Sequence, residues 1–241
     1  MSSSVDLAWG AAGARALAPV CDVLVLVDIL SFTTSLTVAV GRGVEVWPYL
    51  WGTDGAEQLA RDIGAEQLAR DIGAVLARGR HAGVGPTLSP ASLMELEPGT
   101  RLILPSPNGS SIAHSAARGG VPVVGACLRN ARAAGELLQA YERVGLIASG
   151  ERWTDGSLRP AYEDLIGAGV LAAALVRAGA AASPDAEAAA AAALRPRPLE
   201  ECPSGLELVD RGFAEDVRIA GERDVTTVVP LLQSGRFSAA G

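Results

Sequence analysis

Residues 23–40 read VLVLVDILSFTTSLTVAV, and their pattern indicates the class of fold. The continuous run of Val and Leu before Asp28 predicts a buried strand. Residues 31–40 begin with small polar residues and continue with apolar ones, which predicts a helix with Ser31 or Thr33 as its N-cap. A buried strand that leads directly into a helix is typical of the βαβ units that build parallel sheets.

The same alternation of strands and helices continues along the chain. The patterns predict strands over 23–27, 44–50, 101–104, 121–126, 144–149 and 225–230, and helices after residue 110, from about residue 130, over 160–182 and over 206–220. We therefore expect an α/β protein with a three-layer α/β/α fold and a largely parallel or mixed central sheet. Pro48 favours a place near the edge of the sheet for the strand 44–50. Because no linker separates two units, we expect a single domain over residues 1–241.

Composition and charge exclude several classes of protein. The chain has 241 residues, of which 49% are hydrophobic and 20% are charged, as in ordinary globular proteins. Its formal net charge of −7 argues against a nucleic-acid partner. All 20 basic residues are arginines, which excludes a Walker A lysine, a Schiff-base lysine and a pyridoxal phosphate anchor. Any bound anion must therefore be held by arginine, backbone N–H groups or hydroxyls.

Other counts bear on metals and on location. The two histidines and three widely spaced cysteines indicate neither a His-rich metal site, nor a zinc site, nor a disulfide framework. Residues 1–10 have no basic n-region and no apolar h-region, so we expect no signal peptide. The longest alanine run, residues 188–193, is too short to span a bilayer. We therefore expect a cytoplasmic protein with no membrane partner. The sequence is compatible with a homodimer but does not fix the oligomeric state.

One internal repeat interrupts the pattern. Residues 55–63 read GAEQLARDI, and residues 64–72 repeat them without change. A nine-residue insertion adds about 2.5 helical turns, so the two copies would face opposite sides of a helix. We interpret the repeat as a duplication that either lengthens a surface helix or forms a loop.

Small polar residues follow four of the predicted strands. In a parallel sheet the carboxyl ends of the strands lie along one edge, where α/β proteins bind their ligands. Each of these loops also opens a helix, so free N–H groups converge there. We therefore expect a pocket for a compact, oxygen-rich anion such as phosphate, sulfonate or carboxylate. Its candidate residues are Thr33, Thr34, Ser106, Asn108, Gly109, Ser110, Cys127, Arg129, Asn130, Arg152 and Arg159.

Carboxylates accompany these donors. Asp28 ends the first strand, and Glu163 and Asp164 open the long helix. Carboxylates beside an anion site are explained by a divalent cation, and oxygen ligands favour Mg2+. The predicted metal ligands are therefore Asp28, Glu163 and Asp164.

Each candidate also has a structural alternative. The Asp28 carboxylate could cap a helix, and the two acids of the long helix could simply carry favourable charge in its first turn. The arginines could form surface ion pairs, Cys127 could be a buried apolar residue, and Asn108 with Gly109 could form a turn. For His81 and His114 we favour a structural role.

The sequence motifs of several common phosphate-handling enzymes are absent, because the residues that they require do not stand at the required spacing. A cysteine-dependent phosphatase loop needs an arginine where Ala133 stands, and an aspartyl-phosphate motif needs a second aspartate where Leu30 stands. No glycine-rich dinucleotide motif follows the first strand, since Gly41 and Gly43 come after the helix instead.

Five segments together resemble the 2-phosphosulfolactate phosphatase family, the Mg2+-dependent enzymes of coenzyme M biosynthesis. They are VDILSFTTSLTVAV (27–40), LSPASL (88–93), LPSPNGSSI (104–112), GACLRNA (125–131) and GERWTDGSLRPAYEDLIGAG (150–169). The resemblance runs from about residue 22 to about residue 237. It departs from the family at the repeat and at Ser31-Phe32-Thr33, where Arg-Ala-Thr is more usual, so one cation is missing from the expected pocket.

The resemblance implies a phosphatase-like α/β/α domain that hydrolyses the phosphate monoester of a short acid bearing a sulfonate and a carboxylate. In the mechanism that we expect, Mg2+ held by Asp28 with Glu163 or Asp164 polarises the phosphoryl oxygens. The guanidinium groups of Arg129 and Arg152 offset the developing charge. Water or a side chain could attack, with Cys127 as a weaker candidate nucleophile. The alternatives are a phosphatase of another small phospho-acid and a non-catalytic protein that binds small anions.

Overall fold

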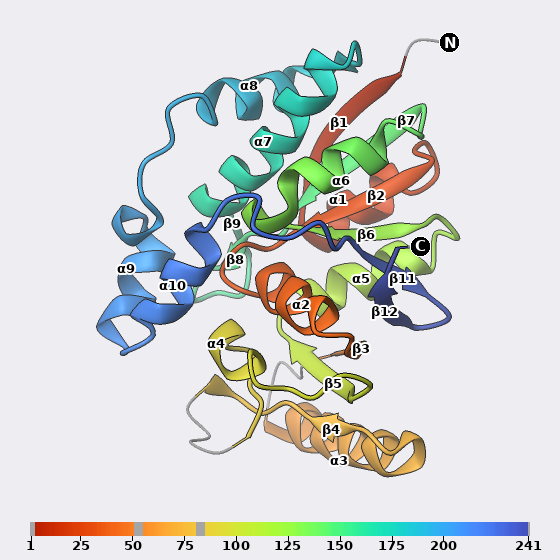
Figure 1. The fold of residues 1–241 in the computed structure, drawn as a ribbon, viewed down its shortest axis with the longest axis vertical. Helices are drawn as coiled ribbons and strands as arrows, with labels where there is room; N and C mark the ends of the chain where they lie inside the picture. The colour runs from red at the N-terminus through yellow and green to blue at the C-terminus, as the bar shows by residue number, and fades with distance from the viewer. Residues whose placement is uncertain (1–2, 51–54, 81–84, 241) are drawn as a thin grey trace.

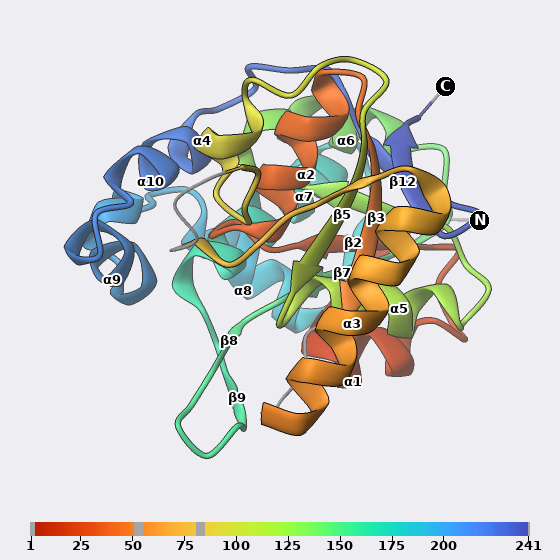
Figure 2. The ribbon, with the colours of Figure 1, turned by 90° about the horizontal axis from the view of Figure 1, so that it is seen from below.

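The computed structural model describes residues 3–50, 55–80 and 85–240, and its middle layer is a ten-stranded sheet (Figure 1). Across the sheet the strands are β10 (Ala181–Ala182), β1 (Ser4–Trp9), β7 (Arg143–Ala148), β2 (Val23–Val27), β6 (Val123–Ala126), β11 (Pro230–Gln233), β12 (Arg236–Ala239), β3 (Glu45–Leu50), β5 (Arg101–Ser106) and β4 (Val75–Leu76). A separate hairpin, β8 (Glu151–Arg152) with β9 (Leu158–Arg159), projects from the body of the molecule (Figure 2).

Two parallel blocks make up the sheet. The strands from β10 to β6 are parallel to their neighbours, and so are β3, β5 and β4. The C-terminal hairpin β11–β12 joins the blocks through antiparallel pairs. The sheet is therefore mixed, as the sequence predicted.

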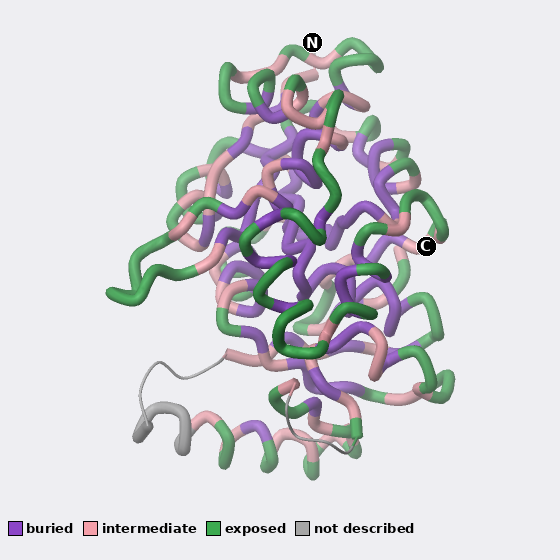
Figure 3. The backbone as a smooth tube through the Cα atoms, turned by 90° about the vertical axis from the view of Figure 1, so that its left-hand side faces the viewer, coloured by how far each residue is buried: buried purple, intermediate pink, exposed green. Residues whose placement is uncertain are grey.

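Helices cover both faces of the sheet, so the predicted three-layer α/β/α class is confirmed. One layer contains α6 (Ala131–Leu138), α7 (Tyr162–Arg177) and α8 (Pro184–Ala192); the other contains α1 (Gly10–Leu17), α2 (Phe32–Gly41), α4 (Pro90–Leu93) and α5 (Gly109–Ala117). Successive side chains of β2 point to opposite faces: Val25 packs in the first layer and Leu24 in the second. Buried residues, purple in Figure 3, fill the centre of the molecule. Within the described ranges, the helices are too short or too polar to cross a membrane.

The chain after β10 differs from the prediction of one helix over 206–220. It forms two helices, α9 (Pro203–Asp210) and α10 (Ala214–Gly221), preceded by the 3-10 helix η3 (Leu199–Glu201). Gly212 between them has φ +86°, a conformation that ends a helix and that L side chains rarely adopt. Gly179, with φ +99°, likewise ends α7 well before residue 182.

Two strand predictions are also corrected. The strand 44–50 is not at an edge, because β3 lies between β12 and β5. Its Pro48 is tolerated because the pairing of β3 with β12 is limited to Val46 opposite Phe237, so the proline interrupts no hydrogen-bonded ladder with β12. Residues 225–229 form no strand, and the pairing begins at Pro230.

The two repeat copies form a single helix, α3 (Gly55–Ile72), beside β4 and β5 (Figure 1). Ile63, the last residue of the first copy, is 58% exposed, whereas Ala65 at the start of the second is buried. The repeat therefore lengthens a surface helix, which is one of the two predicted outcomes.

Candidate functional site

The turn after β2 is built around the Asp28 carboxylate. Its Oδ1 accepts the Phe32 N–H at 3.0 Å, and its Oδ2 accepts the Ser149 hydroxyl at 3.2 Å. Asp28 therefore caps α2, whereas Ser31, the N-cap residue by position, makes no side-chain cap bond. Burial raises the pKa of Asp28, and the hydrogen bonds from Phe32 and Ser149 oppose that shift.

The hydroxyls of Thr33 and Thr34 stabilise the same turn through hydrogen bonds to its carbonyl groups. The Thr33 hydroxyl donates to the Asp28 carbonyl at 2.7 Å, and the Thr34 hydroxyl donates to the Ile29 carbonyl at 2.8 Å. Both side chains are fully buried. Their hydroxyls thus hold the loop that presents Asp28.

Asp164, in the first turn of α7, bridges two loops. Its Oδ1 accepts the Ile29 N–H and its Oδ2 accepts the Gly150 N–H, both at 2.8 Å. These bonds fix the segment after β2 against the segment after β7. Burial, followed by the charge of Asp28, raises the pKa of Asp164 well above its ordinary value. The neighbouring Glu163 is also buried, and its Oε2 accepts the Cys202 thiol at 3.4 Å.

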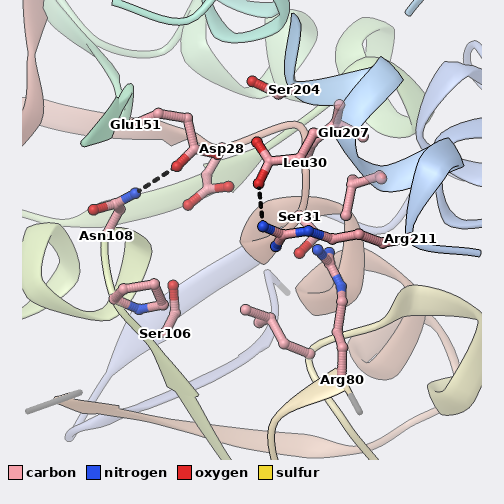
Figure 4. A pocket seen from close by; sticks show the side chains of 13 residues that line it. Asp28, Leu30, Ser31, Arg80, Ser106, Asn108, Glu151, Ser204, Glu207 and Arg211 are labelled. Atoms are coloured by element: carbon pink, nitrogen blue, oxygen red, sulfur yellow. Dashed lines mark hydrogen bonds and ion pairs between the residues drawn. The ribbon is translucent and has the colours of Figure 1, made fainter. Parts of the chain in front are cut away.

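A cavity of about 250 Å3 opens where these loops meet (Figure 4). Charged and hydroxyl side chains from five parts of the chain line it, together with a few apolar ones. The lining residues are Asp28, Leu30, Ser31, Arg80, Leu88, Ser106, Pro107, Asn108, Glu151, Ser204, Glu207, Leu208 and Arg211. The ends of β2, β5 and β7 thus converge as predicted, but the end of β6 does not reach the cavity.

Carboxylates gather at one end of the cavity. Figure 4 shows Asp28 and Glu151 close together, with Asn108 beside them. The Asn108 amide donates to Glu151 Oε2 at 3.4 Å and to the Gly150 carbonyl at 3.1 Å. Burial and then the Asp28 charge raise the pKa of Glu151 to about 7. Ser106 completes this end, and its Oγ accepts the Gly109 N–H at 3.1 Å.

Guanidinium groups gather at the other end. Arg80 Nε lies 3.3 Å from Asp216 Oδ2, and its guanidinium lies over the Phe213 ring at 5.7 Å. Arg211, at the end of α9, pairs with Glu207 at 2.7 Å. Ser31 lies between this pair and Arg80 in Figure 4. The cavity is therefore bipolar, with Asp28 and Glu151 at one end and the two guanidinium groups, one of them paired with Glu207, at the other.

Three predicted residues lie behind the cavity instead of lining it. Arg129 pairs with Glu222 and donates to the Ile219 carbonyl at 3.2 Å. The Cys127 thiol lies 3.4 Å from the Thr37 hydroxyl, and burial raises its pKa. The Asn130 amide donates to the Val228 carbonyl at 3.0 Å. The segment before β11 covers this loop, which includes the 3-10 helix η2 (Leu128–Asn130).

The remaining predicted residues, Thr33, Thr34, Gly109, Glu163 and Asp164 among them, do not line the cavity either. Ser110 is buried, and its hydroxyl donates to the Leu104 carbonyl at 3.1 Å. Arg152 donates to Asn108 Oδ1 at 3.1 Å and lines a second, smaller cavity beside Trp9. Arg159, on β9, lies 5.6 Å from the Trp153 ring. His114 Nδ1 lies 3.1 Å from the Ser110 carbonyl, and His81 is outside the described residues.

Several residues that line the cavity were not predicted from the sequence. Glu151 follows a predicted strand in a polar loop, the same signal that identified Asp28, and could have been found in that way. Arg80 and Arg211 lie in segments without a strand-end signal. Only packing between distant parts of the chain brings those two guanidiniums to the cavity.

The donor set suits Mg2+ better at the cavity than behind it. Asp28 and Glu151 line the cavity, whereas Glu163 and Asp164 do not. In the described ranges, no group of three or more His, Cys, Asp or Glu side chains could hold a metal ion. Two carboxylates are nevertheless enough for Mg2+, which takes its other ligands from water and from substrate phosphates. Asp28 and Glu151 therefore fit this ion.

The chain is similar to a known protein family. The model of the family described as 2-phosphosulpholactate phosphatase matches residues 14–235. The matched segment covers every residue that lines the cavity.

Proposed function

The chain belongs to the 2-phosphosulpholactate phosphatase family, and from this premise we propose that it hydrolyses 2-phosphosulfolactate to sulfolactate and phosphate in the cavity at Asp28. The observation that carries the proposal is the bipolar lining of this cavity. The substrate bears a phosphate, a carboxylate and a sulfonate, and these anionic groups need donors of the kind found there. The proposed partner is thus a small anionic substrate.

The charges of the lining support a dependence on Mg2+. Asp28, Glu151 and Glu207 outnumber Arg80 and Arg211, so ionised carboxylates would repel an anionic substrate. A divalent cation on Asp28 and Glu151 reverses that balance. When bound, Mg2+ would polarise the phosphoryl oxygens and offset their charge.

Several groups of the chain are placed for the remaining tasks. Phe32 N–H and the Ser149 hydroxyl orient Asp28, and the Asn108 amide orients Glu151. Ser106 accepts a hydrogen bond from Gly109, so its own O–H is available to donate to a phosphoryl oxygen. The guanidinium groups at the opposite end attract the other acid groups of the substrate. Cys127 is buried behind the cavity, and we assign it no part in the attack.

Phosphate release from a panel of phospho-acids tests the proposal. We expect release from 2-phosphosulfolactate with Mg2+, and little release when the metal is chelated. Faster release from phospholactate or phosphoglycolate would identify a phosphatase of another small phospho-acid. If the folded protein released phosphate from none of them, with or without Mg2+, the proposal would be wrong and a non-catalytic anion-binding protein would be favoured.

A further inference from the structure

Buried polar atoms without hydrogen bonds gather at the basic end of the cavity. Ser31 is 4% exposed, and its Oγ has no hydrogen-bond partner in the described part of the chain. The same holds for Nε and Nη2 of Arg80. A buried polar group without a partner costs about 1–3 kcal/mol. Groups of this kind that line a cavity indicate a missing ligand with acceptor atoms.

Arg80 is held in position from behind. Its Nε faces Asp216 Oδ2 at 3.3 Å, in an ion pair whose geometry leaves neither atom hydrogen-bonded. The other oxygen of Asp216 accepts the Ser89 hydroxyl at 2.5 Å, which fixes that carboxylate. The Arg80 guanidinium also lies over the Phe213 ring. It is thus a preorganised cation with a free donor at Nη2.

The second cation of the cavity is in a different situation. The Arg211 side chain is 57% exposed and pairs with Glu207, so solvent and a carboxylate already offset its charge. The Arg80 side chain is 16% exposed. Burial lowers the pKa of its guanidinium, and the charge of Asp216 opposes that shift. A substrate anion therefore gains more from Arg80.

We propose that Arg80 and the Ser31 hydroxyl form the subsite for the sulfonate of the substrate, and that Arg80 determines specificity for it. This inference rests on the proposed function. The acidic end holds the phosphate, so the acid group at the far end of the molecule reaches Arg80. A sulfonate offers three acceptor oxygens and remains ionised at any physiological pH. It can accept hydrogen bonds from the two buried donors that have no other partner there, Ser31 Oγ and Arg80 Nη2.

The test compares two substrates in the full-length protein with Mg2+. We expect Arg80→Gln to lower kcat/KM for 2-phosphosulfolactate by about 10- to 100-fold, as expected for a lost charge-assisted hydrogen bond. For phospholactate, which lacks the sulfonate, the loss should stay below about threefold. Arg78→Gln is the matched control, because Arg78 is exposed in the same segment and lines a different cavity. Equal losses on both substrates would overturn the assignment.

A second measurement does not need catalysis. Calorimetry with sulfolactate and Mg2+ should show binding to the parent protein and to Arg78→Gln, and at least tenfold weaker binding to Arg80→Gln. Ser31→Ala, which changes one hydroxyl, should weaken binding by about three- to tenfold and covers the case in which Arg80→Gln fails to fold. Unchanged sulfolactate affinity in these variants would refute the subsite. Selective loss of affinity in a protein that releases no phosphate would retain the subsite and reject the proposed reaction.

Discussion

Replacement of Asp164 tests whether this carboxylate holds the site together or binds metal. In Asp164→Ala the Ile29 and Gly150 N–H groups lose their acceptors. Each buried, unpaired N–H costs about 1–3 kcal/mol, so the free energy of unfolding should fall by about 2–6 kcal/mol. That loss is a large share of the about 5–15 kcal/mol that stabilises an ordinary domain.

Urea unfolding of the metal-free protein measures this loss. Asp164→Asn is the matched control, because its amide keeps one acceptor oxygen and should lose about half as much. A Mg2+ titration of phosphate release separates the two roles: Asp164→Asn should shift half-saturation by less than about threefold. A destabilisation below about 1 kcal/mol, or a shift in Mg2+ affinity as large as that in Asp28→Asn, would show that Asp164 does not act by holding the two loops together.

Three further predictions concern other parts of the molecule. The pKa of Glu151 is raised from 4.5 to about 7 in the folded protein. Protonated Glu151 therefore adds to the free energy of unfolding; this contribution is complete below pH 4.5 and is lost as the pH rises through about 7. Urea unfolding of Glu151→Gln without metal should lack this dependence, and a parallel pH profile in both proteins would contradict the assignment. Cys127→Ala should keep kcat within about threefold, since the thiol is buried behind the cavity, and abolished activity in a folded variant would restore it as a candidate nucleophile. Deletion of one nine-residue copy from α3 should leave kcat/KM unchanged, because this helix packs beside β4 and β5, and a loss above about tenfold would show that the copies support the site.

Local patterns predicted the parallel core of the fold. The strand at Val23 and the helix after it were recognisable because they combine a continuous apolar run with a polar turn. The hairpin β11–β12 was not, because its pairing with β6 and β3 depends on segments far away in the sequence. The break between α9 and α10 at Gly212 was not predicted either, since the sequence alone does not show which glycine adopts positive φ.

The residues of the site likewise fall into those that local patterns predicted and those that long-range contacts place. Asp28 and Asn108 follow strands and Ser106 ends one, and strand ends converge by topology, so their place at the cavity was predictable. Arg129 follows a strand too, yet its side chain forms an ion pair with Glu222, from the C-terminal part of the chain, and does not line the cavity. Arg80 reaches the cavity through its ion pair with Asp216. Contacts of this kind leave no local signature in the sequence.

The most direct test of the central claim is phosphate release from 2-phosphosulfolactate by the parent protein and by Asp28→Asn, each with and without Mg2+. Both proteins are first shown to be folded by their unfolding transitions. We predict that release by the parent requires Mg2+ and that Asp28→Asn lowers it by at least about a hundredfold at saturating metal. Release by a folded Asp28→Asn at the parental rate would contradict the placement of the active site in this cavity.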